Sequence, residues 1–257
     1  MTCSIPTTNE ISKLLRNSDA PLALVTGASG GVGKCCAKAL ADIGYATLVV
    51  GRSGEKIRKL VDEINNDFGA TRPSIGFEAD LSDRKDIKRL LTEVECPKVP
   101  EVFIYAAGVT SNCTERFDDT ELEEVLAVNT LAPIYLTRGI ISLMERNEKG
   151  YIINIASRAG LVGFSDKGIY GASKAATLRF FDALYAKNLG TDIRITSICP
   201  GWINTPMAVS CGCQRNPEEI LQPEDVSSSI AWLVSSPSRI RIRELVVEAG
   251  GRISASM

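Results

Sequence analysis

The segment Leu22-Ala23-Leu24-Val25-Thr26-Gly27-Ala28-Ser29-Gly30-Gly31-Val32-Gly33 decides how this chain is expected to fold. Its apolar first half predicts a buried strand, its glycines predict a tight turn, and the residues from Lys34 to Ile43 follow with helical periodicity. Glycines let a pyrophosphate approach the free N–H groups at a helix N-terminus, where the helix dipole also favours negative charge. The segment therefore predicts a strand, turn and helix that together bind a nucleotide phosphate.

Two alternatives to a dinucleotide-binding turn are less consistent with the same residues. A mononucleotide P-loop has four residues between its first Gly and a Gly-Lys pair, which Ser or Thr follows. Here five residues separate Gly27 from Gly33, and Cys35 follows Lys34, so both requirements fail. A glycine turn without any ligand is disfavoured because a strand and a helix flank the turn.

The rest of the chain alternates apolar runs with amphipathic stretches, as βαβ units do. We expect an α/β fold in a single domain, residues 21–257, after an N-terminal extension, residues 1–20. A capping box at Thr120 to Glu123 predicts the start of the long helix that carries Asn129, and Gly190 is expected to end a later helix. The expected strands are 22–26, 45–51, 74–79, 102–106, 151–156, 192–199 and 244–248.

Tyr170 and Lys174 stand four residues apart, and Ser157 precedes Tyr170 by thirteen residues, in a chain without histidine. Positions i and i+4 of a helix share a face, so the Lys174 ammonium is expected beside the Tyr170 phenol. A tyrosine ordinarily titrates near pH ~10, and a neighbouring cation lowers that pKa. Tyr170 is therefore a candidate general acid or base, although a surface Tyr and Lys can share this spacing by chance.

Together these motifs resemble the short-chain dehydrogenase/reductase family, whose members are single-domain NAD(P)-dependent oxidoreductases with a Rossmann-type doubly wound parallel sheet of seven strands. The resemblance covers nearly the whole chain. It implies that Tyr170 transfers a proton, that Ser157 hydrogen-bonds the substrate oxygen, and that Lys174 lowers the Tyr170 pKa and holds the nicotinamide ribose. Asn129 would position a water that leads to Lys174. The implied cofactor-binding residues are Gly27, Ser29, Gly31, Val32, Gly33, Arg52, Ser53, Asp80, Leu81, Ala106, Ala107, Gly108, Tyr170, Lys174, Pro200, Gly201, Ile203 and Thr205.

Two positions bear on the cofactor and on its support. The second strand ends at Gly51-Arg52-Ser53, where an NAD-preferring enzyme carries an Asp or Glu for the ribose hydroxyls. The Arg52 guanidinium suits a 2′-phosphate, so we expect NADP(H) over NAD(H), the alternative being a solvated Arg at a strand end. After the fourth strand, Tyr105 replaces the family's Asn, so we expect the central sheet to lose the brace of that side chain.

Substrate identity is less defined by the sequence. A lid at residues 205–221 is expected over a pocket with Ser157, Phe164, Trp202 and Met207, and Arg158 either meets a substrate carboxylate or faces solvent. The leading interpretation is a carbonyl reductase or dehydrogenase for a small ketone, aldehyde, secondary alcohol or hydroxy acid. A 3-oxoacyl thioester reductase and a non-catalytic nucleotide-sensing protein are the alternatives.

Composition limits the partners. A net charge of −2 provides no basic surface for nucleic acid, and the first twenty residues contain no apolar core of a signal peptide or membrane span, so we expect a cytoplasmic protein. The eight cysteines lack the paired C-x-x-C spacing of zinc sites, so no metal is expected. Cys211 and Cys213 are the pair whose redox role stays open.

The sequence also predicts self-association. The apolar positions of the helices that carry Asn129 and Tyr170 cover more than the ~100° arc that one sheet contact needs. We therefore expect a homodimer, or a homotetramer built from it. The alternative is that Phe180 or Phe181 covers a neighbouring loop of the same subunit.

Overall fold

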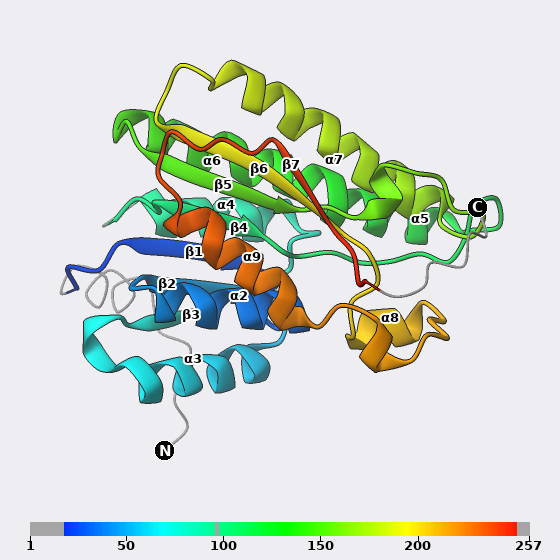
Figure 1. Ribbon diagram of the computed structural model, residues 1–257, viewed down its shortest axis with the longest axis horizontal. Coiled ribbons are helices and arrows are strands. Elements are labelled where there is room, and N and C mark those ends of the chain that lie inside the picture. Colours follow the sequence, from blue (N-terminus) through cyan, green and yellow to red (C-terminus); the bar gives the residue numbers. More distant parts are fainter. Residues whose placement is uncertain (1–17, 96–97, 251–257) are drawn as a thin grey trace.

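The computed structural model describes residues 18–95 and 98–250. Within them, seven parallel strands form one sheet in the order β3-β2-β1-β4-β5-β6-β7, with helices on both faces (Figure 1). The expected doubly wound sheet is confirmed, and each strand end lies within one residue of its predicted position; residues 1–17 of the predicted extension lie outside the described residues. The strands are β1 Leu22–Thr26, β2 Ala46–Gly51, β3 Ser74–Glu78, β4 Val102–Tyr105, β5 Gly150–Ile155, β6 Ile193–Pro200 and β7 Glu244–Val247.

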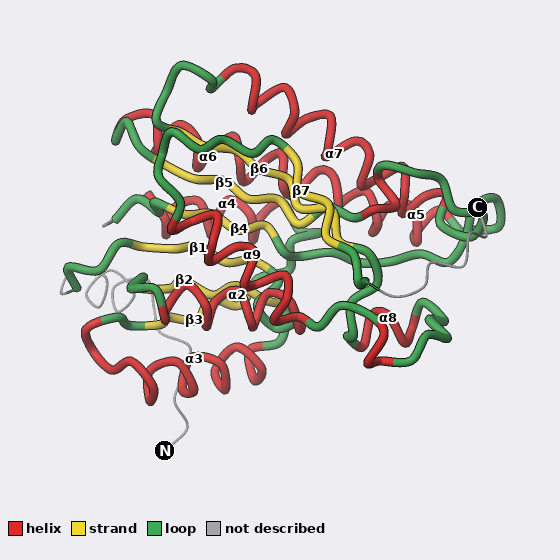
Figure 2. The backbone as a smooth tube through the Cα atoms, viewed as in Figure 1, coloured by secondary structure: helices red, strands yellow, loops and turns green. Residues whose placement is uncertain are grey.

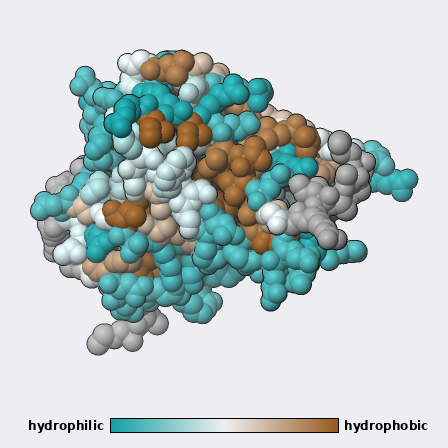
Figure 3. All heavy atoms as spheres, in the orientation of Figure 1, coloured by the Kyte–Doolittle hydropathy of each residue, from teal (hydrophilic) through white to brown (hydrophobic). Residues whose placement is uncertain are grey.

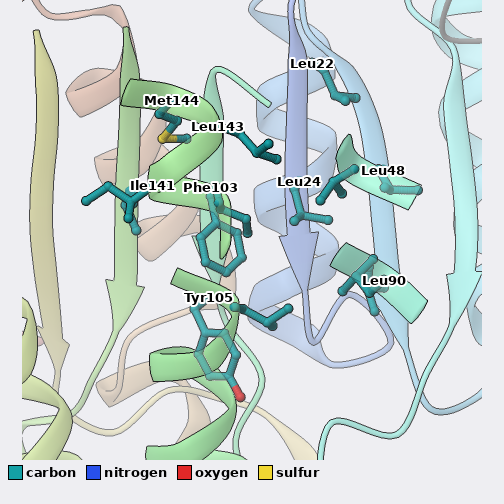
Figure 4. Close-up of a cluster of buried hydrophobic side chains, with 14 of the residues drawn as sticks. Leu22, Leu24, Leu48, Leu90, Phe103, Tyr105, Ile141, Leu143 and Met144 are labelled. Carbon is teal, nitrogen blue, oxygen red and sulfur yellow. The ribbon is translucent and has the colours of Figure 1, made fainter. Parts of the chain in front are cut away.

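Alternating side chains of the strands face two separate hydrophobic cores, because helices cover both faces of the sheet. Leu22 and Leu24 belong to one core, part of which Figure 4 shows, whereas Ala23 and Val25 belong to the other. The first core includes side chains of α4 Arg84–Glu95, α6 Ala132–Arg146 and α7 Gly168–Lys187, and the second includes side chains of α2 Gly31–Asp42, α3 Gly54–Phe68 and α9 Pro223–Ser235.

The direction of the strand order reverses between β1 and β4. β2 and β3 lie on one side of β1, and the chain then crosses to the other side for β4 (Figure 2). In an open α/β sheet, ligands bind beyond the carboxyl ends of the strands at such a switch point. The fold alone therefore places a candidate site between the turn after Thr26 and the loop after Tyr105.

The helix ends correct two predictions. Asp118, and not Thr120, is the N-cap of α5 (Asp119–Leu126), because its side chain accepts a hydrogen bond from the Glu121 N–H. Thr120 lies inside the helix and donates its hydroxyl to Asp118 at 2.5 Å. α7 ends at Lys187, three residues before the predicted stop at Gly190. Asp118 caps the start of α5, and at the end of α7 the Asn188 side chain donates to the Leu184 carbonyl at 2.8 Å; spacing alone resolves neither contact.

Tyr105 compensates for the family's missing Asn. The ring of Tyr105 is fully buried, and its hydroxyl donates to the Val128 carbonyl at 2.5 Å. Val128 belongs to a π-helical turn, Ala127–Leu131, that joins α5 to α6. A π-turn changes the helical hydrogen-bond pattern, and such turns are frequent at functional sites. The end of β4 is therefore braced against the helix by a phenol, a contact that the expected absence of the Asn side chain did not anticipate.

One helical segment meets the length and composition of a membrane span. Residues 119–146 form 28 continuous helical residues with a mean hydropathy of 1.3 in their most apolar window. Half of that window is buried inside the protein, where the segment contributes to the first core. A core helix of a globular protein has the same features, so the segment is weak evidence for a membrane contact.

Candidate active site

A cavity of about 560 Å³ lies at the carboxyl ends of the strands and includes the switch point. Of the residues that the sequence assigned to a site, only Ser53 and Asn129 do not line it. Ser53 caps α3 by accepting a hydrogen bond from the Lys56 N–H. The assigned residues that line the cavity are Gly27, Ser29, Gly31, Val32, Gly33, Arg52, Asp80, Leu81, Ala106, Ala107, Gly108, Ser157, Phe164, Tyr170, Lys174, Pro200, Gly201, Trp202, Ile203, Thr205 and Met207.

The glycine turn packs backbone directly against backbone. Gly27 has a φ of +68°, and a Cβ there would lie 2.5 Å from the Ala107 nitrogen. A Cβ on Gly33 would lie 2.3 Å from the Gly27 carbonyl oxygen. Because Gly30 is the N-cap of α2 and has no side chain to cap it, the first N–H groups of the helix remain available to a ligand. This cradle fits the pyrophosphate of a dinucleotide.

The end of the cavity beyond β2 carries the groups that suit an adenosine phosphate. The Arg52 side chain is 59% exposed and forms a 3.2 Å ion pair with Glu124. Burial raises the pKa of Asp80, but hydrogen bonds from the Ser82 N–H and hydroxyl, together with the charge of Arg52, lower it overall. Lys56 also lines this end, and the sequence analysis missed it. Its position in the first turn of α3, four residues after Arg52, was the available signal.

Tyr170 lines the cavity, and its phenol is the candidate proton donor. Burial raises its pKa to about 12, although a hydrogen bond with the Ser157 side chain acts in the opposite direction. Ser157 is held by the start of a short 3-10 turn, Arg158–Gly160, where its hydroxyl accepts from the Ala159 N–H at 3.1 Å. Tyr170 is therefore protonated at neutral pH and able to donate.

Lys174 lies one helical turn beyond Tyr170, as predicted, but it does not lower the phenol pKa in this structure. Its Nζ is 5.8 Å from the Tyr170 ring centre and donates to the Ile155 carbonyl at 3.1 Å. Burial disfavours the ammonium and lowers the Lys174 pKa to about 8. The prediction of a lowered Tyr170 pKa is therefore wrong here, because burial of the phenol raises the pKa by more than the Ser157 hydrogen bond lowers it.

Asn129 is fully buried behind the cavity. Its amide nitrogen donates to the Val109 carbonyl at 2.8 Å and to the Ser173 hydroxyl at 3.0 Å, and its oxygen accepts from the Val109 N–H. The side chain thus ties the loop after β4 to α7. A Cβ on Gly108 would lie 3.4 Å from both Asn129 and Lys174, so these two side chains approach each other across that glycine.

The predicted lid is an ordered segment rather than an open loop. It contains α8 Pro206–Ser210, which Thr205 caps, and a 3-10 turn at Pro217–Glu219. Hydrogen bonds between Leu221 and both Trp202 and Asn204 close its base. The lid also rests on the loop after β4, because the Cys211 sulfur lies 3.0 Å from the Thr110 hydroxyl and the Asn112 amide donates to Ser210.

The sequence analysis misjudged or missed three basic residues in the substrate half of the cavity. Arg158 is paired with Glu248 at 2.7 Å, so its charge is already matched within the protein. Lys167 lines the cavity and is only 7% exposed, and Arg215 lines it from the lid. Lys167 is the residue immediately before α7 and stands three residues before Tyr170, and this closeness to the candidate proton donor was the signal that could have found it.

The arrangement is suited to proton transfer beside a nucleotide. A protonated phenol, a hydroxyl and a buried amine lie in the same cavity as an uncapped helix N-terminus. Among the described residues, no cluster of three or more His, Cys, Asp or Glu side chains could hold a metal ion.

Comparisons with known proteins agree with the site. Residues 21–216 match the family model described as short chain dehydrogenase. An NADP-dependent 3-hydroxy acid dehydrogenase, YdfG of Salmonella typhi, is 26% identical over 233 residues, which are 86% of this chain and 92% of the relative.

Solved structures share the fold. Serine dehydrogenase in complex with NADP⁺ has a TM-score of 0.81 and 25% identity, with 92% of this chain and 98% of that chain covered. A variant of actinorhodin polyketide ketoreductase with NADPH has a TM-score of 0.81 and 27% identity, and the match covers 90% of this chain and 97% of that chain.

The lowered pKa of Lys174 predicts a pH-dependent stability penalty. Below pH 8 the lysine is charged in both states, so the folded state carries the full cost of burying it. As pH rises from about 8 toward the ordinary value of 10.5, the folded state loses the proton first, and the cost disappears. The stability advantage of Lys174→Met over the natural protein should therefore shrink by about 2 kcal/mol between pH 7 and pH 10.

Urea unfolding of both proteins at the two pH values measures this difference. Lys85→Met, on the exposed surface of α4, is the control for removing a lysine outside the cavity. If the stability advantage of Lys174→Met stays constant or grows as pH rises, the lowered pKa of Lys174 is contradicted.

Proposed function

The chain belongs to the short-chain dehydrogenase family and is an oxidoreductase, and we propose that it transfers hydride between NADP(H) and a small ketone, aldehyde or secondary alcohol. One observation carries the proposal: Tyr170, Ser157 and Lys174 line the same cavity as the glycine turn. A proton donor and a nucleotide-binding turn in one cavity are what carbonyl reduction requires. Carbonyl reductase activity is the form we favour.

The residues present fit a bound NADP(H). The α2 N-terminus would hold the pyrophosphate, Asp80 and Leu81 would contact the adenine ring, and Arg52 with Lys56 would meet the 2′-phosphate. NADP-bound neighbours and the NADP-dependent relative support this preference over NAD(H). When bound, the cofactor supplies the hydride in reduction or accepts it in alcohol oxidation.

The protein's own groups would move the proton. Tyr170 donates its phenolic proton to the carbonyl oxygen, and its raised pKa keeps it in the donating form at neutral pH. Ser157 hydrogen-bonds the same oxygen and stabilises the negative charge that develops on it. Lys174 holds the nicotinamide ribose, and Asn129 positions a water near Lys174 while it fixes the loop after β4. In the oxidative direction the proton returns to Tyr170.

The alternatives are less supported. A 3-oxoacyl thioester reductase would need basic surface for its carrier, whereas the lid exposes Glu218 and Glu219 next to its single basic residue, Arg215. The family's fatty-acid ketoreductases also have a Thr-Gly lead-in to the last strand, which Glu244 does not follow here. A nucleotide-sensing protein would not need a phenol, a hydroxyl and an amine in its cavity. The relatives named as dehydrogenases of 3-hydroxy acids and of serine keep small hydroxy acids among the candidate substrates.

The proposed enzyme is a homodimer or homotetramer. Leu131, the last residue of the π-helical turn before α6, is 46% exposed, and Ile134, Tyr135, Phe180 and Leu184 are half-buried. Phe181, by contrast, is buried in the core and does not contribute to a free surface. A second apolar surface lies over the edge strand β7, where Val246 is 47% exposed (Figure 3). Burial of such surfaces favours association.

A screen of NADPH oxidation by ketones, aldehydes and acyl thioesters, together with NADP⁺ reduction by hydroxy acids, tests the function. With a substrate that this screen identifies, Tyr170→Phe should lower turnover by at least ~10², because the variant lacks the transferable proton. Its affinity for the cofactor should change by no more than a few-fold. Lys174→Ala should lower both turnover and cofactor affinity. Tyr185→Phe, on α7 but outside the cavity lining, is the matched control. Turnover retained by Tyr170→Phe would exclude the assigned role.

Arg52 should select the cofactor. NADPH should bind more tightly than NADH, and Arg52→Ala should narrow the difference by about 1–2 kcal/mol, since the exposed guanidinium is partly screened. Fluorescence titration with both cofactors measures it. Glu124→Gln, which frees Arg52 from its ion pair, should not weaken NADPH binding. Equal NADPH and NADH affinities in the natural protein would overturn the preference.

Self-association is measurable by sedimentation equilibrium at micromolar concentration. The expected mass is at least twice the 27.7 kDa of one chain. A monomer with full activity would refute the proposed assembly.

A further inference from the structure

Lys167 is a buried cation in the substrate half of the cavity that proton transfer does not use. It stands at the N-cap of α7, is 7% exposed and lines the cavity with Trp202, whose ring centre is 6.0 Å from its Nζ. Its partners are the amide oxygen of Asn112 and, at 3.3 Å, the carboxylate of Asp166. A buried ammonium is costly unless it is paired with an anion.

The protein matches this charge only weakly. Asp166 is 59% exposed, and ion pairs of exposed carboxylates contribute little because water screens them. Asn112 is neutral. Lys167 therefore keeps the capacity to bind an anion that enters the cavity and is shielded there from water.

The other cations of the cavity are less suited to this task. Arg158 is already paired with Glu248 at 2.7 Å, and Lys174 donates to the Ile155 carbonyl. Arg52 lies at the far end beyond β2, and Arg215 is exposed on the lid. Of these cations, Lys167 is the buried one whose ammonium lies over the Trp202 ring.

We propose that Lys167 binds the carboxylate of the substrate, so that the enzyme acts on short hydroxy acids or the corresponding oxo acids. This inference rests on the proposed function and specifies its substrate class. Lys167 is the N-cap residue of α7, Tyr170 is the third residue of that helix, and both line the same cavity. A carboxylate held by Lys167 would therefore lie in the same cavity as a carbinol that contacts Tyr170.

A purely structural role for Lys167 makes a different prediction. Asn112 accepts a hydrogen bond from Lys167 and donates to Ser210, so the lysine could simply fix the lid through this amide. If so, Asn112→Ala would reproduce the effect of changing Lys167. If Lys167 binds substrate, removal of its charge should affect anionic substrates selectively.

The kinetic test compares a series of 2-, 3- and 4-hydroxy acids with their methyl esters, with NADP⁺ as oxidant. The natural protein should prefer an acid, and Lys167→Met should lower the acid-to-ester ratio of kcat/KM by about 10- to 150-fold, as expected for one charge-assisted hydrogen bond. Lys167→Arg, which retains the charge, should keep most of the ratio. Asn112→Ala should also keep it.

Three results would overturn the proposal: no acid preference in any pair, an unchanged ratio in Lys167→Met, or an equal fall in Asn112→Ala. If one of these results is obtained and the enzyme still reduces uncharged carbonyl compounds, the proposed function is retained and only the carboxylate site is rejected. If the enzyme turns over none of the tested substrates, the proposed function itself is rejected.

A binding measurement decides the carboxylate site even without turnover. Trp202 and Trp232 are the two tryptophans, and Trp232 lies on α9 outside the cavity lining, so Trp232→Phe leaves Trp202 as the reporter. In the NADP⁺-saturated protein, 3-hydroxybutanoate should change Trp202 fluorescence at concentrations at least 10-fold below those of its methyl ester. Adding Lys167→Met should abolish that difference, and equal responses to acid and ester would contradict the site.

Discussion

The close contact between the ends of β1 and β4 is the constraint on which the rest of the structure depends. At Gly27 no side chain fits, because a Cβ would lie 2.5 Å from the Ala107 backbone nitrogen. This contact lets the chain turn directly into α2, and it leaves the helix N-terminus open at the point where the strand order reverses. The cavity, the nucleotide cradle and the position of the loop after β4 all follow from it.

Burial then determines what the polar groups of the cavity can do. It raises the pKa of Tyr170 and lowers that of Lys174, so the phenol keeps its proton and the amine is close to losing one at mildly alkaline pH. The same low-polarity environment strengthens any contact that Lys167 makes with an anion. A folded state that carries two buried lysines beside one cavity gives up stability, a cost that functional sites commonly bear.

The sequence predicted the strands and the cofactor turn well because their signals are local. Apolar runs, glycine spacing and the Tyr170–Lys174 interval depend on neighbouring residues alone, and the sheet has its strands where those patterns placed them. The pKa of Tyr170 and the burial of Lys167 depend on how segments pack, and the spacing that places Lys167 near Tyr170 in the sequence reveals neither quantity. Tyr105 is a further case: its hydroxyl braces the helix at Val128, a contact between residues 23 positions apart.

The central claim is that the cofactor turn and Tyr170 serve one hydride transfer. Mass spectrometry of the product formed from a carbonyl substrate and stereospecifically deuterated [4-²H]NADPH tests it most directly. The account predicts that, with the label on the transferred side of the ring, the product carries one deuterium on the former carbonyl carbon. Oxidised cofactor with no deuterium in the product from either labelled diastereomer would contradict direct hydride transfer in this cavity.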